Sequence, residues 1–194
     1  YCVPAIVPTD NFNTVLYIGD GTTGRSIPTG LDADLVIIKN RSTATQDWIW
    51  FDSIRGPSEY IRSNRGDSPQ YNAGSGQGVS AFGTGTVTIG DNAAGNLGAN
   101  GNYGGQWSGA AKHVMYAFTG GGTAVSAGGT NLTNRLASAN PDAGFSIMTY
   151  TGSSSDGTIE HGLTQKPELW IFKNLTNGKP WFTLTNIVDD SVDY

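Results

Sequence analysis

The stretch FNTVLYIG at Phe12–Gly19 decides the fold, because the stretch FSIMTYTG at Phe145–Gly152 repeats it. In both stretches a phenylalanine, a tyrosine and a glycine stand at the same spacing. The segment Asn13–Ile18 alternates as a half-buried strand does. We therefore expect a β-strand at both places and a chain built from a repeated module.

The match continues outward from these two stretches. LVIIKN at Leu35–Asn40 corresponds to LWIFKN at Leu169–Asn174, and Trp48 corresponds to Trp181. The offset between the copies stays between 132 and 134 residues, and its small changes fall in turns. Insertions confined to turns are typical of a structural repeat.

The repeat predicts three parts along the chain. Residues 1–11 form an extended lead-in, residues 12–140 a complete β-sandwich module, and residues 141–194 a partial second copy, with Asn140-Pro141 at the boundary. A partial sandwich exposes a strand edge and an apolar face. We expect these to be covered by further residues, by a neighbouring chain or by packing on the first module.

The composition favours strands and turns. Of the 194 residues, 28 are glycine, 37% are hydrophobic and 14% are charged, and no helical apolar stripe is present. We expect an all-β sandwich with strands at Leu35–Lys39, Asp47–Asp52 and Lys112–Phe118. Both faces of Asp47–Asp52 are apolar, so Trp48 and Trp50 are candidates for an assembly interface.

The charge pattern excludes several partners and cofactors. The formal net charge is −5 and no two lysines or arginines are adjacent, so we expect no nucleic acid. No apolar run of membrane-spanning length is present, and we expect no membrane insertion. With one cysteine and two histidines the chain offers no zinc cluster, and we expect no metal and no cofactor.

Acidic residues near aromatic residues raise the possibility of a glycan-degrading enzyme, which would need two facing carboxylates. Asp47, Asp52 and Glu59 are the candidates. No spacing singles out a pair, and Asp47 and Asp52 are expected on opposite faces of their strand. We therefore expect no catalytic residues.

Carbohydrate binding is the more serious possibility. Sugar sites combine an aromatic platform with polar groups, and the Gly- and Asn-rich segment from Asp91 to Trp107 offers both. The candidate ligand-binding residues are Asp91, Asn92, Asn102, Tyr103 and Trp107. In the alternative interpretation, its two aromatic residues only anchor a loop on the sheet.

Seven phrases carry a resemblance to a known module: Thr9–Tyr17, Leu35–Ser42, Phe51–Gly56 and Tyr60–Asn64 in the first copy, and Gly144–Gly152, Gly157–Leu163 and Ile171–Asn174 in the second. These phrases resemble a repeated module of phage tail-fibre and virion structural proteins, which is similar to concanavalin A-like and laminin-G-like jelly-roll sandwiches. The segment from Gly74 to Trp107 departs from the pattern of that module. The resemblance implies a role in a virion and carries no catalytic residues across.

The resemblance implies a phage virion structural protein, a tail fibre or surface adhesin that acts in assembly and host attachment. Its expected partners are other virion chains, further copies of itself, for example in a trimer, and a host-surface glycan. Its expected location is the virion, after synthesis in the host cytoplasm. The alternatives are a lectin-like carbohydrate-binding module of a secreted or cell-surface protein and, third, a glycan-degrading enzyme.

Overall fold

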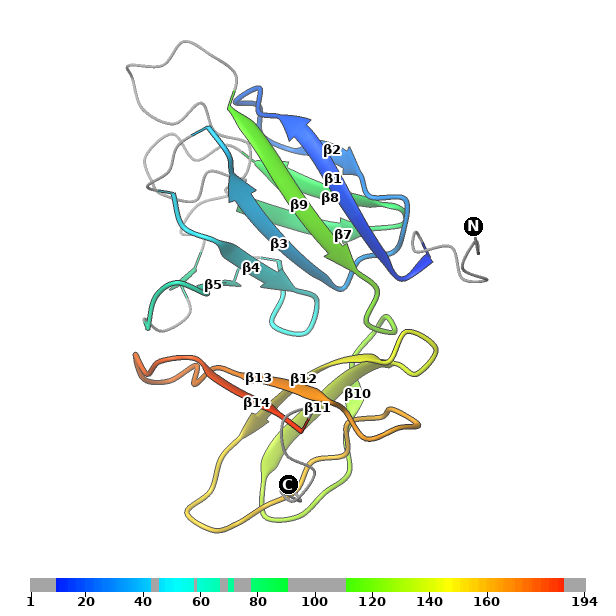
Figure 1. Cartoon of the computed structure of the whole chain (residues 1–194), viewed down its shortest axis with the longest axis vertical. Helices are drawn as coiled ribbons and strands as arrows, with labels where there is room; N and C mark the ends of the chain where they lie inside the picture. The colour runs from blue at the N-terminus through cyan, green and yellow to red at the C-terminus, as the bar shows by residue number, and fades with distance from the viewer. Residues whose placement is uncertain are drawn as a thin grey trace.

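A computed structural model of the chain describes residues 10–42, 46–57, 59–66, 70–71, 78–90 and 111–186. These residues form β-strands and turns, with no α-helix among them. Figure 1 shows two bodies, an upper one that contains strands β1 to β9 and a lower one that contains β10 to β14.

The upper body contains two antiparallel sheets. The larger sheet has six strands, which in spatial order are β1 (Phe12–Ile18), β9 (Lys112–Phe118), β3 (Leu35–Asn40), β4 (Ile49–Asp52), β5 (Glu59–Arg62) and β6 (Gln70–Tyr71). The smaller sheet has three strands, in the order β2 (Arg25–Pro28), β8 (Thr86–Gly90) and β7 (Gly78–Gly83).

The core of the upper body lies between these two sheets. Alternation along β3 and β4 turns Val36, Ile38 and Phe51 inward, where they belong to one buried cluster with Val87 and Ile89 of β8. These side chains are almost completely inaccessible to solvent. Two sheets packed on a shared apolar layer form a sandwich, so the prediction of an all-β sandwich is confirmed.

The lower body contains two smaller sheets. One has three strands, β10 (Val125–Ser126), β11 (Thr133–Asn140) and β12 (Phe145–Thr151), and the other is a hairpin of β13 (Leu169–Phe172) and β14 (Phe182–Thr185). The boundary expected at Asn140-Pro141 falls instead inside the β11–β12 hairpin. The sequence of β11 is small and polar, and its strand was therefore missed.

The repeat is preserved in three dimensions. Strand β12 is the counterpart of β1, and the β13–β14 hairpin is the counterpart of β3–β4. Leu35 lies opposite Asp52 in the first hairpin, and their counterparts Leu169 and Thr185 lie opposite each other in the second. Because a shift of one residue would move every side chain to the other face, this shared register is strong evidence for one module used twice.

Among the described residues, the central strand β9 of the first copy has no counterpart in the second. Strand β9 pairs with β1 on one side and with β3 on the other. In the described part of the chain no strand pairs with both β12 and β13, and the two belong to separate sheets. The second copy therefore keeps an incomplete sheet.

Candidate functional site

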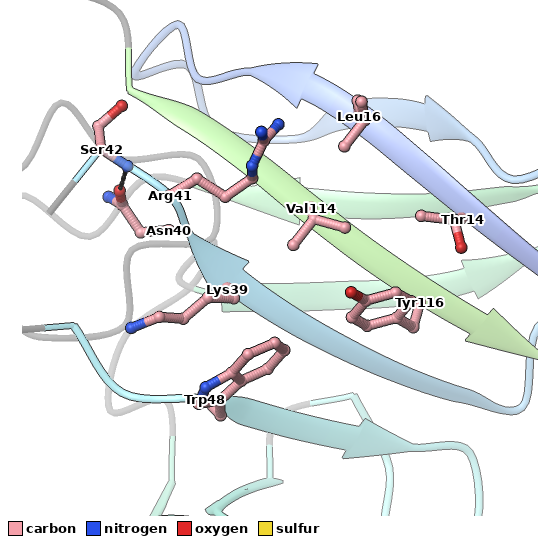
Figure 2. Close-up of a pocket in the computed structure, with 9 residues that line it drawn as sticks. All are labelled: Thr14, Leu16, Lys39, Asn40, Arg41, Ser42, Trp48, Val114 and Tyr116. Carbon is pink, nitrogen blue, oxygen red and sulfur yellow. Dashed lines mark hydrogen bonds between the residues drawn. The ribbon is translucent and has the colours of Figure 1, made fainter. Parts of the chain in front are cut away.

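A groove of about 690 Å³ lies on the outer face of the six-stranded sheet, away from the sandwich core. Figure 2 shows its side chains rising from β1, β3, β9 and the segment before β4. Its volume is within the range of pockets that hold small molecules. The lining residues are Thr14, Leu16, Lys39, Asn40, Arg41, Ser42, Trp48, Val114 and Tyr116.

Aromatic rings form a row along this face. The rings of Trp48 and Tyr116 are nearly parallel, with centroids 6.1 Å apart, and Tyr116 is related in the same way to Phe12 at 6.3 Å. The row exists because β9 places Tyr116 on its outward face between the flanking strands. Trp48 and Tyr116 thus give the groove an aromatic floor.

The polar end of the groove is a turn after β3. The side-chain oxygen of Asn40 accepts a hydrogen bond from the backbone N–H of Ser42 at 2.8 Å (Figure 2). The hydroxyl of Ser42 accepts a bond from the N–H of Lys112 at 2.8 Å, and Lys39 donates to the carbonyl of Gln46. The turn is therefore fixed to two neighbouring segments before any ligand binds.

The second copy builds the same turn. Asn174 accepts a bond from the N–H of Thr176 at 2.9 Å, and Lys173 donates to the carbonyl of Lys179 at 2.6 Å. These four residues are the counterparts of Asn40, Ser42, Lys39 and Gln46. The Lys-Asn-x-Ser/Thr sequence is thus a turn-forming element, in which the asparagine side chain caps its own loop.

Two of the three carboxylates considered for catalysis, Asp47 and Asp52, are held in ion pairs. Asp47 is buried, and its oxygens lie 2.8 Å from Arg65 Nε and 3.4 Å from Arg62 Nη1. Burial alone would raise the pKa of Asp47, but hydrogen bonds from Asn64 and Arg65 and the nearby arginine charges outweigh it and lower the pKa. Asn64 also accepts a bond from the backbone N–H of Trp48 at 3.3 Å, so this network positions the aromatic floor.

Asp52 and Glu59 do not join Asp47 in a site. Asp52 is buried and lies 2.5 Å from Arg55 Nε. Glu59 begins the neighbouring strand β5. None of the three carboxylates lines the groove, which has no acidic residue among its described lining side chains.

The two tryptophans predicted for assembly have different surroundings. Trp48 lies in the groove. Trp50 contacts Trp181 of the lower body, with ring centroids 5.2 Å apart. At Trp50 the strand is therefore covered on both faces, as expected from its sequence. Trp181 covers the face of Trp50, and the core covers the face of Ile49 and Phe51.

The other predicted ligand residues, Asp91, Asn92, Asn102, Tyr103 and Trp107, lie outside the described residues. The groove itself was missed from sequence. The alternation of β9 was visible, but it does not tell which face meets the core and which meets solvent. A residue such as Arg41, in a turn, carries no pattern at all.

The groove combines aromatic rings with polar side chains, the two kinds of group that a sugar ligand contacts. A pyranose ring presents a face of C–H groups that packs on an aromatic ring, and its hydroxyls need hydrogen-bond partners at the edge. Trp48 and Tyr116 supply the rings, while Thr14, Ser42 and Arg41 supply polar groups beside them. The arrangement suits binding of a sugar chain along an open surface.

The described residues contain no group of three or more histidine, cysteine, aspartate or glutamate side chains arranged to hold a metal ion. Among them there is also no helix long and apolar enough to cross a membrane.

Comparison with curated proteins and with solved structures gives no match. One family model does match, over residues 7–193, and therefore across both copies of the module. The chain belongs to this family, which is described as a domain of unknown function (DUF7483).

Proposed function

We propose that this chain is a non-enzymatic attachment module of a phage tail fibre or similar virion surface structure, which binds a host-surface glycan through the groove of its large sheet. The observation that carries the proposal is the fixed aromatic floor of Trp48 and Tyr116 beside the hydrogen-bonded turn at Asn40–Ser42. Such pre-organisation lowers the entropic cost of binding.

Two further observations support this proposal. The groove has no carboxylate among its described lining residues, whereas glycoside hydrolysis uses a facing pair of them. The phrases that resemble phage tail-fibre modules, among them Leu35–Ser42, include the turn that borders the groove. The virion assignment rests on that resemblance, and the assignment as a jelly-roll of the concanavalin A type rests on it too.

The test is a glycan array followed by titration of the best ligand. Trp48→Ala should weaken binding at least about tenfold, which is ~1.4 kcal/mol, because it removes the ring that packs on the sugar. Trp48→Phe should retain most of the affinity because it keeps an aromatic face. Affinity that is unchanged in Trp48→Ala would exclude the groove, and release of reducing sugar from any bound glycan would exclude the non-enzymatic role.

A second function, assembly with other copies of the chain, is favoured by the exposure of the second copy. Tyr17 is 8% exposed, but its counterpart Tyr150 is 44% exposed. Ile49 is 3% exposed, but its counterpart Phe182 is 58% exposed. The same positions of one module thus face a core in the first copy and solvent in the second. This difference supports the proposal that another chain covers the exposed side chains.

Sedimentation over a range of concentrations tests this second function. Phe182→Ser should shift the protein toward monomer. Val125→Ser is the matched control, because Val125 is also an exposed apolar side chain, at 65% exposure, but is not a counterpart of a core residue. A wild-type protein that stays monomeric at high concentration, or equal effects of both variants, would contradict the assembly role.

A further inference from the structure

We propose that the groove selects an acidic glycan, one whose sugars carry carboxylate or sulfate groups, and that Arg41 is the residue that recognises the anionic group. This inference rests on the proposed glycan-binding function and names its ligand class.

The charge of the groove is opposite to that of the chain. The protein has a formal net charge of −5. The groove nevertheless contains Lys39 and Arg41, and no aspartate or glutamate lines it among the described residues. Lys112, an exposed residue, stands on the same face of β9 as Val114 and Tyr116 because side chains alternate along a strand. Positive charge is therefore concentrated at this end of the sheet, where it attracts an anion.

Arg41 is free to bind because the fold does not need its side chain. The turn is held by Asn40, Ser42 and Lys39, while Arg41 contributes only its backbone N–H, which donates to the carbonyl of Lys112 at 2.7 Å. Arg41 is exposed, and its side chain forms no ion pair with any described carboxylate. Figure 2 shows the side chain reaching from the turn over β9, with its guanidinium on the side of Leu16.

The second copy of the module supplies an internal control. Its turn has the same hydrogen bonds, yet Leu175 stands where the first copy has Arg41. An arginine at this position is therefore not required to form the turn. Its guanidinium is available for a ligand in the first copy alone.

The guanidinium of Arg41 and the rings of Trp48 and Tyr116 together fit one ligand class, a glycan with anionic groups. A guanidinium donates two parallel hydrogen bonds to a carboxylate or sulfate, and this pairing is stronger than neutral hydrogen bonds. Trp48 and Tyr116 pack on a sugar ring of the same glycan chain. A neutral sugar would leave the arginine without a counter-charge.

Matched polymers provide the experiment. Binding of the protein to polygalacturonate is compared with binding to the same polymer in fully methyl-esterified form, and dextran sulfate is compared with dextran. We expect at least about tenfold tighter binding of each charged polymer, with an affinity that falls as salt is added. Preference for polygalacturonate over dextran sulfate identifies a carboxylate, and the reverse preference identifies a sulfate.

The variant Arg41→Leu, which installs the residue found in the second copy, should reduce this preference at least about tenfold. Lys179→Leu removes the same charge at an exposed position outside the groove and should leave the preference unchanged. Equal effects of the two variants, or tighter binding of the neutral polymers that depends on Trp48, would overturn the acidic-ligand inference and leave the proposed function standing. Absence of binding to any polymer or arrayed glycan would overturn both.

Discussion

Asp47 shows how single residues of this protein serve the site without touching it. Its carboxylate is buried, yet Arg62, Arg65 and Asn64 surround it with positive charge and donors. Asn64 also accepts a hydrogen bond from the backbone N–H of Trp48, so the network fixes the position of that backbone. From the sequence, Asp47 was a candidate for catalysis, because carboxylates beside aromatic residues occur in glycan-degrading sites. Only the positions of Arg62 on the next strand and Arg65 in the following turn show that Asp47 is a structural, ion-paired carboxylate and not a candidate catalytic acid.

The pH dependence of stability should report on Asp47. Since folding lowers its pKa, its stabilising contribution is complete above the ordinary aspartate pKa of about 3.9 and is lost as the pH falls below that value. Urea unfolding should therefore give a constant free energy of unfolding from about pH 5 to 7 and a lower one at about pH 3.

In Asp47→Asn the free energy of unfolding at neutral pH should fall by about 3 kcal/mol, because two arginines lose their counter-charge, and its decrease toward low pH should be smaller than in wild type. Asp142→Asn, in an exposed turn, is the control and should behave as wild type. An unchanged acid profile in Asp47→Asn would show that other groups dominate.

At the scale of the structural elements, the junction between the two bodies is fixed by hydrogen bonds to one buried carboxylate. The carboxylate of Asp34 accepts hydrogen bonds from the N–H groups of Gly120 and Gly122, both at 2.9 Å, and from the hydroxyl of Ser53 at 2.8 Å. The end of β9 is thereby tied to the start of β3. The glycine content of residues 120–129 alone would suggest a flexible segment, because it does not reveal which glycines are packed.

Two adjacent glycines of this junction should differ in their tolerance of alanine. Both have positive φ, 109° at Gly121 and 81° at Gly122. A Cβ at Gly122 would meet nothing within 4 Å, whereas a Cβ at Gly121 would lie 2.0 Å from the carbonyl oxygen of Ala139. Gly122→Ala should cost about 1–2 kcal/mol from backbone strain, and Gly121→Ala clearly more. Denaturant unfolding measures both, and equal costs would show that the junction can open.

Across the whole molecule, the contact of Trp50 with Trp181 joins the lower body to the upper one. Trp181 also donates from its indole nitrogen to the carbonyl of Arg62 at 2.9 Å. Trp181 is the counterpart of Trp48, so one position of the repeat supplies the groove in the first copy and this contact in the second. The repeat was readable from sequence because its spacing survives, but the different surroundings of the two copies depend on long-range packing.

A double-mutant cycle should measure this connection. Trp181 is partly buried, so Trp181→Ala should lower the free energy of unfolding by about 1–3 kcal/mol. In the double variant with Trp50→Ala, the loss of unfolding free energy should be smaller than the sum of the two single-variant losses by about 0.5–1.5 kcal/mol. The reason is that the two rings contact each other. Circular dichroism during chemical unfolding provides the values. Additive losses would mean that the two bodies are not coupled through these rings.

The central place of β9 determines how the upper body would bear a mechanical load. This strand is paired along seven residues with β1 and along six with β3, and it leads directly into the junction. Suppose that a ligand is held at Trp48 and Tyr116 while the lower body is pulled. The force then acts along β9 and loads the hydrogen bonds to β1 and β3 in shear, all at the same time. The β13–β14 hairpin has one ladder of four pairs, and we expect it to open at a lower force than the sheet that holds the ligand.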